Sequence, residues 1–194
     1  MKIGYYVQGS TDEAVVRGLS ARWCPNAELA AGKFRGSSKL SFRREIANAL
    51  FDLRDDKHCD VLVVLTDSDA NAWREVKRRE WERIPVECQH LVVFGVAERN
   101  IECWLSLDRG ALAAEIGCKP QDLLVEDPKG IVESGFGYGR QDVEDVQMRI
   151  SRFVQASTIR NWIKGKSFED FYDDVRGLAA QTGCSVPNER EIDG

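Results

Sequence analysis

Three short apolar runs constrain the fold more than any other feature of this chain. They are IGYYV at 3–7, VLVVLT at 61–66 and LVVFGV at 91–96. None of them alternates apolar with polar residues, as a half-exposed strand would. Strands of this kind are typical of a parallel sheet that helices cover on both faces. A further strand is expected in AELAAGKF, and apolar residues at helical spacing mark helices at 12–23 and 41–54. The sequence therefore predicts an α/β fold in which strands and helices alternate.

The second half of the chain has a different pattern. A charged, largely solvated helix is expected at 70–83, before the third apolar run, and after Val96 only helices and loops follow. We therefore predict an α/β core over 1–108, a helical extension packed on it over 109–182, and a polar, mobile tail over 183–194.

Charge and cysteine content limit the partners and the compartment. A net charge of −5 argues against a protein that wraps nucleic acid by overall charge, so a polyanion would have to meet a local basic patch or a metal ion. The six cysteines include no CxxC pair, and we expect them to be reduced rather than to form a disulfide framework. The apolar runs are too short to span a membrane. Together these features predict a cytoplasmic protein.

The first candidate site lies where the run at 61–66 ends. Asp67 and Asp69 follow it directly, and the two-residue period of extended chain would turn both carboxylates to the same side. Ligands bind at the carboxyl edge of open α/β sheets, and paired carboxylates suit Mg²⁺ or Mn²⁺. A second interpretation has Asp69 capping a helix that begins at Ala70, with Asp67 in a turn.

Two further acidic groups follow apolar strands. Ser10 and Glu13 have the spacing of a capping box, which leaves Asp12 unexplained and able to reach the same sheet edge. Glu98 and Glu102 are four residues apart and would share one face of a helix. Taken alone, this second group is better explained as an ordinary amphipathic helix with solvated acids.

Basic residues are concentrated in one stretch. GKFRGSSKLSFRRE is a candidate phosphate-contacting patch, with solvated surface as the alternative, and its basic residues are Lys33, Arg35, Lys39, Arg43 and Arg44. Two other segments, EDPKG with Lys129 and the glycine-rich GFGYGR, are candidates for a loop that closes over the sheet edge.

Taken together, VQGSTDE, DSD and ERNIECWLSLD resemble the motifs of a Toprim domain, the family of topoisomerase and primase catalytic modules and of OLD (overcoming lysogenization defect) nucleases. The likeness is greatest to small stand-alone Toprim-like proteins, and it extends to Pro128-Lys129 and to SFEDF at 167–171. The resemblance implies a Mg²⁺- or Mn²⁺-dependent nuclease. It also implies a role in bacteriophage defence with an ATPase partner of the ABC or SMC type, and DNA rather than RNA as substrate.

The resemblance also assigns residues. It implies metal ligands at Asp12, Asp67, Asp69 and Glu102, and it adds Gln8 and Lys129 to the catalytic positions. Gln8 departs from the family, which has a glutamate there. An amide has no charge for a metal ion and cannot accept a proton near neutral pH. The alternative is therefore a catalytically silent Toprim-like module that binds nucleic acid or an ATPase.

Overall fold

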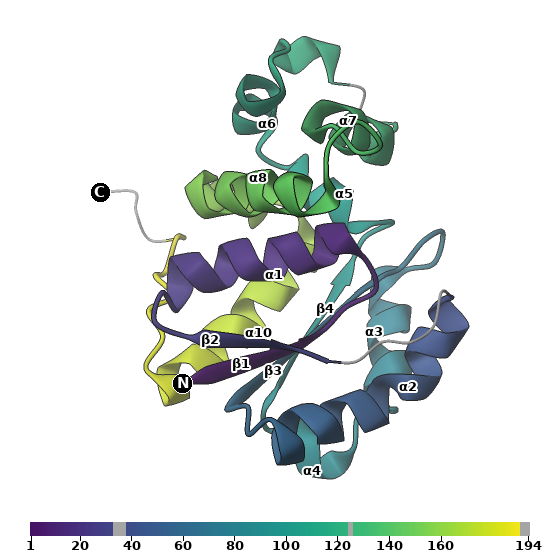
Figure 1. Cartoon of the computed structure of the whole chain (residues 1–194), viewed down its shortest axis with the longest axis vertical. Coiled ribbons are helices and arrows are strands. Elements are labelled where there is room, and N and C mark those ends of the chain that lie inside the picture. Colours follow the sequence, from purple (N-terminus) through teal and green to yellow (C-terminus); the bar gives the residue numbers. More distant parts are fainter. Residues whose placement is uncertain (33–37, 124–125, 191–194) are drawn as a thin grey trace.

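The fold is an α/β sheet of four parallel strands, seen in a computed structural model that describes residues 1–32, 38–123 and 126–190 (Figure 1). The strand order is β2-β1-β3-β4, and the strands are β1 (Lys2–Tyr6), β2 (Glu28–Ala31), β3 (Val61–Asp67) and β4 (Val92–Ala97). In register, Ile3 lies opposite both Leu29 of β2 and Val61 of β3. The predicted α/β class and the alternation of strands and helices are confirmed.

Helices connect successive strands, as parallel pairing requires. They are α1 (Ser10–Trp23), α2 (Lys39–Phe51) with the π-helical turn η1 (Asp52–Asp56), α3 (Trp73–Trp81) and the short α4 (Val86–Gln89). The later helices are α5 (Ile101–Leu105), α6 (Arg109–Ile116), the 3₁₀ turn η2 (Pro120–Asp122), α7 (Pro128–Phe136), α8 (Val143–Ala156), α9 (Ile159–Trp162) and α10 (Lys166–Thr182).

Two apolar clusters cover the two faces of the sheet. Successive side chains of a strand point to opposite faces, so Tyr5 packs with α1 whereas Tyr6 packs with α2. The cluster on the α2 side also takes in α3 and α4 through Val76 and Cys88. The other cluster includes α1, α10 and the helices between α5 and α9.

The first part of the helical extension, α6 to α8, lies outside α1, whereas α10 packs on the sheet. Figure 1 shows α8 running along α1 on the side away from the sheet, with α6 and α7 beyond it. The two helices approach closely at Gly18, where an added Cβ atom would lie 2.6 Å from the Ser151 carbonyl oxygen. Trp104 of α5 donates a hydrogen bond from Nε1 to Ser167 Oγ at 2.8 Å and so connects the core to α10.

The last described residues are fastened to the core, contrary to the expected mobile tail. Cys184 forms a disulfide with Cys24 at the end of α1, which also contradicts the expectation that the cysteines are reduced. Beyond it, the Ser185 amide donates to the Trp23 carbonyl at 3.0 Å, and Glu189 pairs with Arg22 at 3.3 Å. The other four cysteines are free thiols, of which Cys59 and Cys88 are buried. Across the described ranges, no helix combines the length and apolarity that a membrane crossing needs.

Candidate active site

The strand order creates a switch point between β1 and β3. The chain leaves β1 toward β2 on one side, whereas β3 pairs with β1 on the other side. Ligands of open α/β sheets bind in the crevice at the carboxyl ends of two such strands. At this position the Thr66 hydroxyl of β3 donates to Oε1 of Gln8, which follows β1, at 3.1 Å. The candidate active site therefore centres on residues that the sequence placed at strand ends.

Asp12 is held in this crevice by the first turn of α1. It is the third residue of the helix, and its carboxylate accepts a hydrogen bond from the Gly9 amide at 3.0 Å. The predicted capping box of Ser10 and Glu13 is therefore wrong, because Asp12 caps the helix start. Glu13 instead accepts a hydrogen bond from the Tyr5 hydroxyl at 2.6 Å. This arrangement leaves the Asp12 side chain buried, with 5% of its surface exposed.

Two further carboxyl groups act on Asp12 at this edge. The pKa of Asp12 is raised well above its ordinary value, first by burial and then by the nearby charges of Asp67 and Glu102. These residues follow or end β1, β3 and β4, three adjacent strands. Asp67 and Glu102 are thus near enough to Asp12 for their charges to act on it, whereas a shared metal site stays a prediction.

Glu102 is a buried residue of α5 rather than a solvated acid. Only 6% of its surface is exposed, and burial raises its pKa, with opposing contributions from Lys129 and the Thr11 hydroxyl. The interpretation as an ordinary solvated helix is therefore wrong for Glu102. Glu98 is exposed and precedes the helix, since Arg99 has a φ of +65° and α5 begins at Ile101. Glu98 and Glu102 consequently do not share a helical face.

Asp69 is placed differently from both sequence interpretations. Its φ of +55° ends the extended chain, so the two-residue period does not carry over from Asp67. It also does not cap a helix, because α3 begins at Trp73, with Ala72 in the capping position. Asp69 lies instead in an exposed turn after the strand.

Backbone hydrogen bonds join this turn to the segment after β4. The Asp69 amide donates to the Arg99 carbonyl at 2.8 Å, and the Arg99 amide donates to Ser68 Oγ at 2.9 Å. Asp69 and Arg99 are both in the left-handed region, which costs non-glycine residues about 1–3 kcal/mol and is found most often at functional sites. Residues 69–72 and 98–100, which follow β3 and β4, line an open cavity of about 530 Å³.

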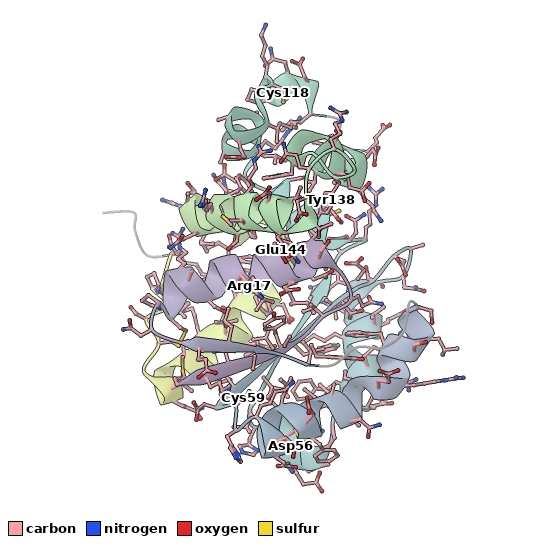
Figure 2. The ribbon with its side chains drawn as sticks, in the orientation of Figure 1. Arg17, Asp56, Cys59, Cys118, Tyr138 and Glu144 are labelled. Carbon is pink, nitrogen blue, oxygen red and sulfur yellow. A yellow bond between two sulfur atoms is a disulfide. The ribbon has the colours of Figure 1, made fainter. Side chains whose placement is uncertain are left out.

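Lys129 and a tyrosine from the glycine-rich stretch complete the site. Lys129 is exposed in the first turn of α7, close enough to Glu102 to lower its pKa, so EDPKG contributes to a helix start rather than to a loop. The Tyr138 hydroxyl lies within hydrogen-bond distance of Ser10 Oγ (3.1 Å) and Thr11 Oγ1 (2.9 Å). Figure 2 shows Tyr138 beside the start of α1. Sequence reasoning missed Tyr138 and Thr11, because no local pattern relates segments so far apart.

The predicted phosphate-contacting patch is only partly described. Lys33 and Arg35 lie outside the described residues, and Lys39 is described only as the first residue of α2. Arg43 forms an ion pair with Glu80 of α3 at 3.0 Å, and Arg44 is exposed. Arg43 therefore connects two helices instead of standing free for a phosphate.

Comparison with family models, with curated proteins and with solved structures found no match to this chain.

Proposed function

We propose that this chain cuts phosphodiester bonds of nucleic acid with the aid of Mg²⁺ or Mn²⁺, in the manner of the Toprim family that its motifs resemble. One observation carries the proposal. Asp67 and Glu102 lie near enough to Asp12, at the carboxyl edge of the sheet, for their charges to raise its pKa. Carboxyl groups that repel one another in a crevice are stabilised by a cation between them.

The donor chemistry of these residues fits a hard divalent cation. Carboxylate oxygens are the protein ligands that Mg²⁺ and Mn²⁺ prefer. In the parts of the chain that are described, no three Asp, Glu, His or Cys side chains are grouped as a ready metal site, so the coordination remains part of the proposal. A bound ion would polarise a phosphoryl oxygen and acidify a water molecule.

The neighbouring side chains suit a phosphate group at this edge. Lys129 is exposed, pairs with Glu133 at 3.8 Å and lies near enough to Glu102 to lower its pKa, so it can exchange its exposed partner for a phosphate oxygen. The Tyr138 hydroxyl, together with Thr11 in the first turn of α1, holds the helix start that positions Asp12.

Gln8 favours a second candidate, a module that binds nucleic acid or an ATPase without cutting. Its amide oxygen already accepts the Thr66 hydroxyl and so holds two strand ends together, a role that needs no charge. Losing a positioned base typically costs about 10²–10⁴-fold in rate, so the wild-type chain would cut slowly or not at all. The ATPase partner, phage defence and DNA as substrate belong to the proposal, whereas the predicted cytoplasmic location does not fit the disulfide. The Cys24–Cys184 disulfide argues against a reducing compartment.

Cleavage assays separate the two candidates. Wild type, Gln8→Glu and Asp67→Ala are incubated with plasmid, single-stranded DNA and RNA in Mg²⁺ or Mn²⁺, with Asp145→Ala on the exposed face of α8 as the control. The nuclease is supported if wild type or Gln8→Glu cuts a substrate, Asp145→Ala cuts it as wild type does, and Asp67→Ala does not cut. The silent module is favoured if wild type and Gln8→Glu both bind nucleic acid and neither of them cuts it.

Metal binding is tested separately by thermal unfolding. Mn²⁺ is expected to raise the melting temperature of wild type and of Asp145→Ala, and to leave the Asp12→Ala, Asp67→Ala double variant unchanged. An equal shift in the double variant removes these residues as metal ligands.

A further inference from the structure

The strongest unassigned feature is positive charge on α3 and the turn after it. Residues 73–83 contain five basic and three acidic side chains in a protein whose net charge is −5. The sequence interpretation placed the basic patch elsewhere and treated this helix as solvated surface. The contacts of each charge show which of them are neutralised.

Lys77 and Glu80 are the paired charges of this region. Lys77 donates hydrogen bonds to Asp170 and Asp174 of α10. The Glu80 carboxylate, 3% exposed, forms ion pairs at 2.9–3.0 Å with three arginines, which are Arg43, Arg79 and Arg83. Three guanidinium groups around one carboxylate leave an excess of positive charge on this side of the molecule.

Arg74 and Arg78 are the unneutralised charges. They are one helical turn apart and exposed, and among the described residues neither has an ion-pair partner. Arg74 lies over the Trp73 ring, 4.4 Å from its centroid. Both arginines line a shallow groove of about 480 Å³, whose floor includes Trp73 and Trp81. The acids in this groove are Glu82 and the Lys77-bound Asp170.

The groove begins beside the candidate active site. Trp73 directly follows the turn 69–72, which begins two residues after Asp67 at the end of β3 and lines the open cavity. Arg99 lines the same cavity from the segment after β4. Arg99 adds one cation to this cavity, beside the acids Asp69 and Glu98, and the turn 69–72 connects the cavity to the start of α3.

We propose that the α3 groove binds the phosphodiester backbone of a nucleic acid strand, with Arg74 and Arg78 contacting phosphates. Side chains four residues apart on a helix stand about 6 Å apart, so two arginines can contact successive phosphates of one strand. Trp73 is buried beneath Arg74, but Trp81 is partly exposed, and an aromatic side chain in a basic groove suits bases and sugars better than it suits an acidic protein. The role of the groove as a path to the cutting site rests on the proposed function, whereas its affinity for nucleic acid does not.

The test measures binding without cleavage. The full chain is titrated into a labelled single-stranded DNA in EDTA at several salt concentrations, and the Arg74→Gln, Arg78→Gln double variant is compared with wild type. Each phosphate contact on a single strand contributes about −0.7 to the slope of log K against log salt, so the double variant should have a slope smaller in magnitude by about 1.4. The control is Lys119→Gln with Arg152→Gln, two exposed basic residues of the helical extension. Arg74→Lys with Arg78→Lys should restore the slope, because it restores the charges.

The outcomes separate the two proposals. Binding that weakens only in the α3 glutamine variant supports the groove even if no cutting is detected, in which case the nuclease proposal alone fails. An unchanged slope in that variant, or no binding by wild type, overturns the groove. Loss of affinity for polyglutamate but not for DNA also overturns it, because the groove would then serve an acidic protein. Unchanged melting temperatures verify that the variants are folded.

Discussion

Removing the Cys24–Cys184 disulfide is expected to destabilise the protein strongly. The bond joins residues 160 apart, so it restricts most of the unfolded chain. The chain-entropy relation gives about 5 kcal/mol for a loop of this length, and removal of native disulfides typically costs about 2–5 kcal/mol. For a chain of this size each kcal/mol corresponds to about 2–4 °C in melting temperature, so a loss of about 5–20 °C is expected.

The measurement is thermal unfolding of wild type, Cys184→Ser and Cys118→Ser with and without a phosphine reductant. Cys118→Ser is the control, because Cys118 is a free thiol in wild type. Reduction should lower the melting temperatures of wild type and of Cys118→Ser to that of Cys184→Ser. The melting temperature of Cys184→Ser should not change on reduction. Alkylation of the unfolded, unreduced wild type should modify four cysteines of six. Six modified cysteines together with an unchanged melting temperature would refute the disulfide and the reasoning built on its loop.

Two further predictions concern buried polar groups. Glu80→Ala leaves three arginines without their carboxylate. Because these arginines are partly exposed, we expect the free energy of unfolding in urea to fall by about 2–3 kcal/mol, below the usual 3–5 kcal/mol for a buried pair. The same loss in Glu87→Ala, at an exposed position, would contradict this reasoning. Burial and Glu13 raise the pKa of Tyr5 to about 12, so the folded protein keeps a proton that the unfolded chain releases above about pH 10, and stability falls as pH rises from 10 to 12. Tyr5→Phe should flatten this fall in urea unfolding at several pH values, and an unaltered slope would rule out the effect.

The strands were predictable because a strand that is buried on both faces of the sheet appears in the sequence as a continuous run of apolar residues. The runs at 61–66 and 91–96 became β3 and β4 with shifts of one residue. The meeting of Asp12, Asp67 and Glu102 followed from the same logic, since acids after adjacent parallel strands reach one edge. Local pattern was sufficient for these features.

Features that depend on backbone conformation or distant contacts were not predictable. Because Asp69 and Arg99 have a left-handed backbone, α3 and α5 begin later in the sequence than expected. The same turns separate Asp69 from Asp67 and Glu98 from Glu102, which regular spacing would align. Arg43 finds its partner Glu80 across two helices, which a count of charges cannot show. Cys24 and Cys184 lie near opposite ends of the sequence, with no spacing motif to join them.

The position of α1 between the sheet and α8 has a consequence for dissecting the protein. A fragment that stops at residue 108 would lose α8 and α10, although these helices cover apolar side chains of α1 and β4. The bare surface would favour self-association over a folded monomer. The acidic crevice is therefore best studied in the whole chain, since the helices that come last in the sequence complete the interior of the part that comes first.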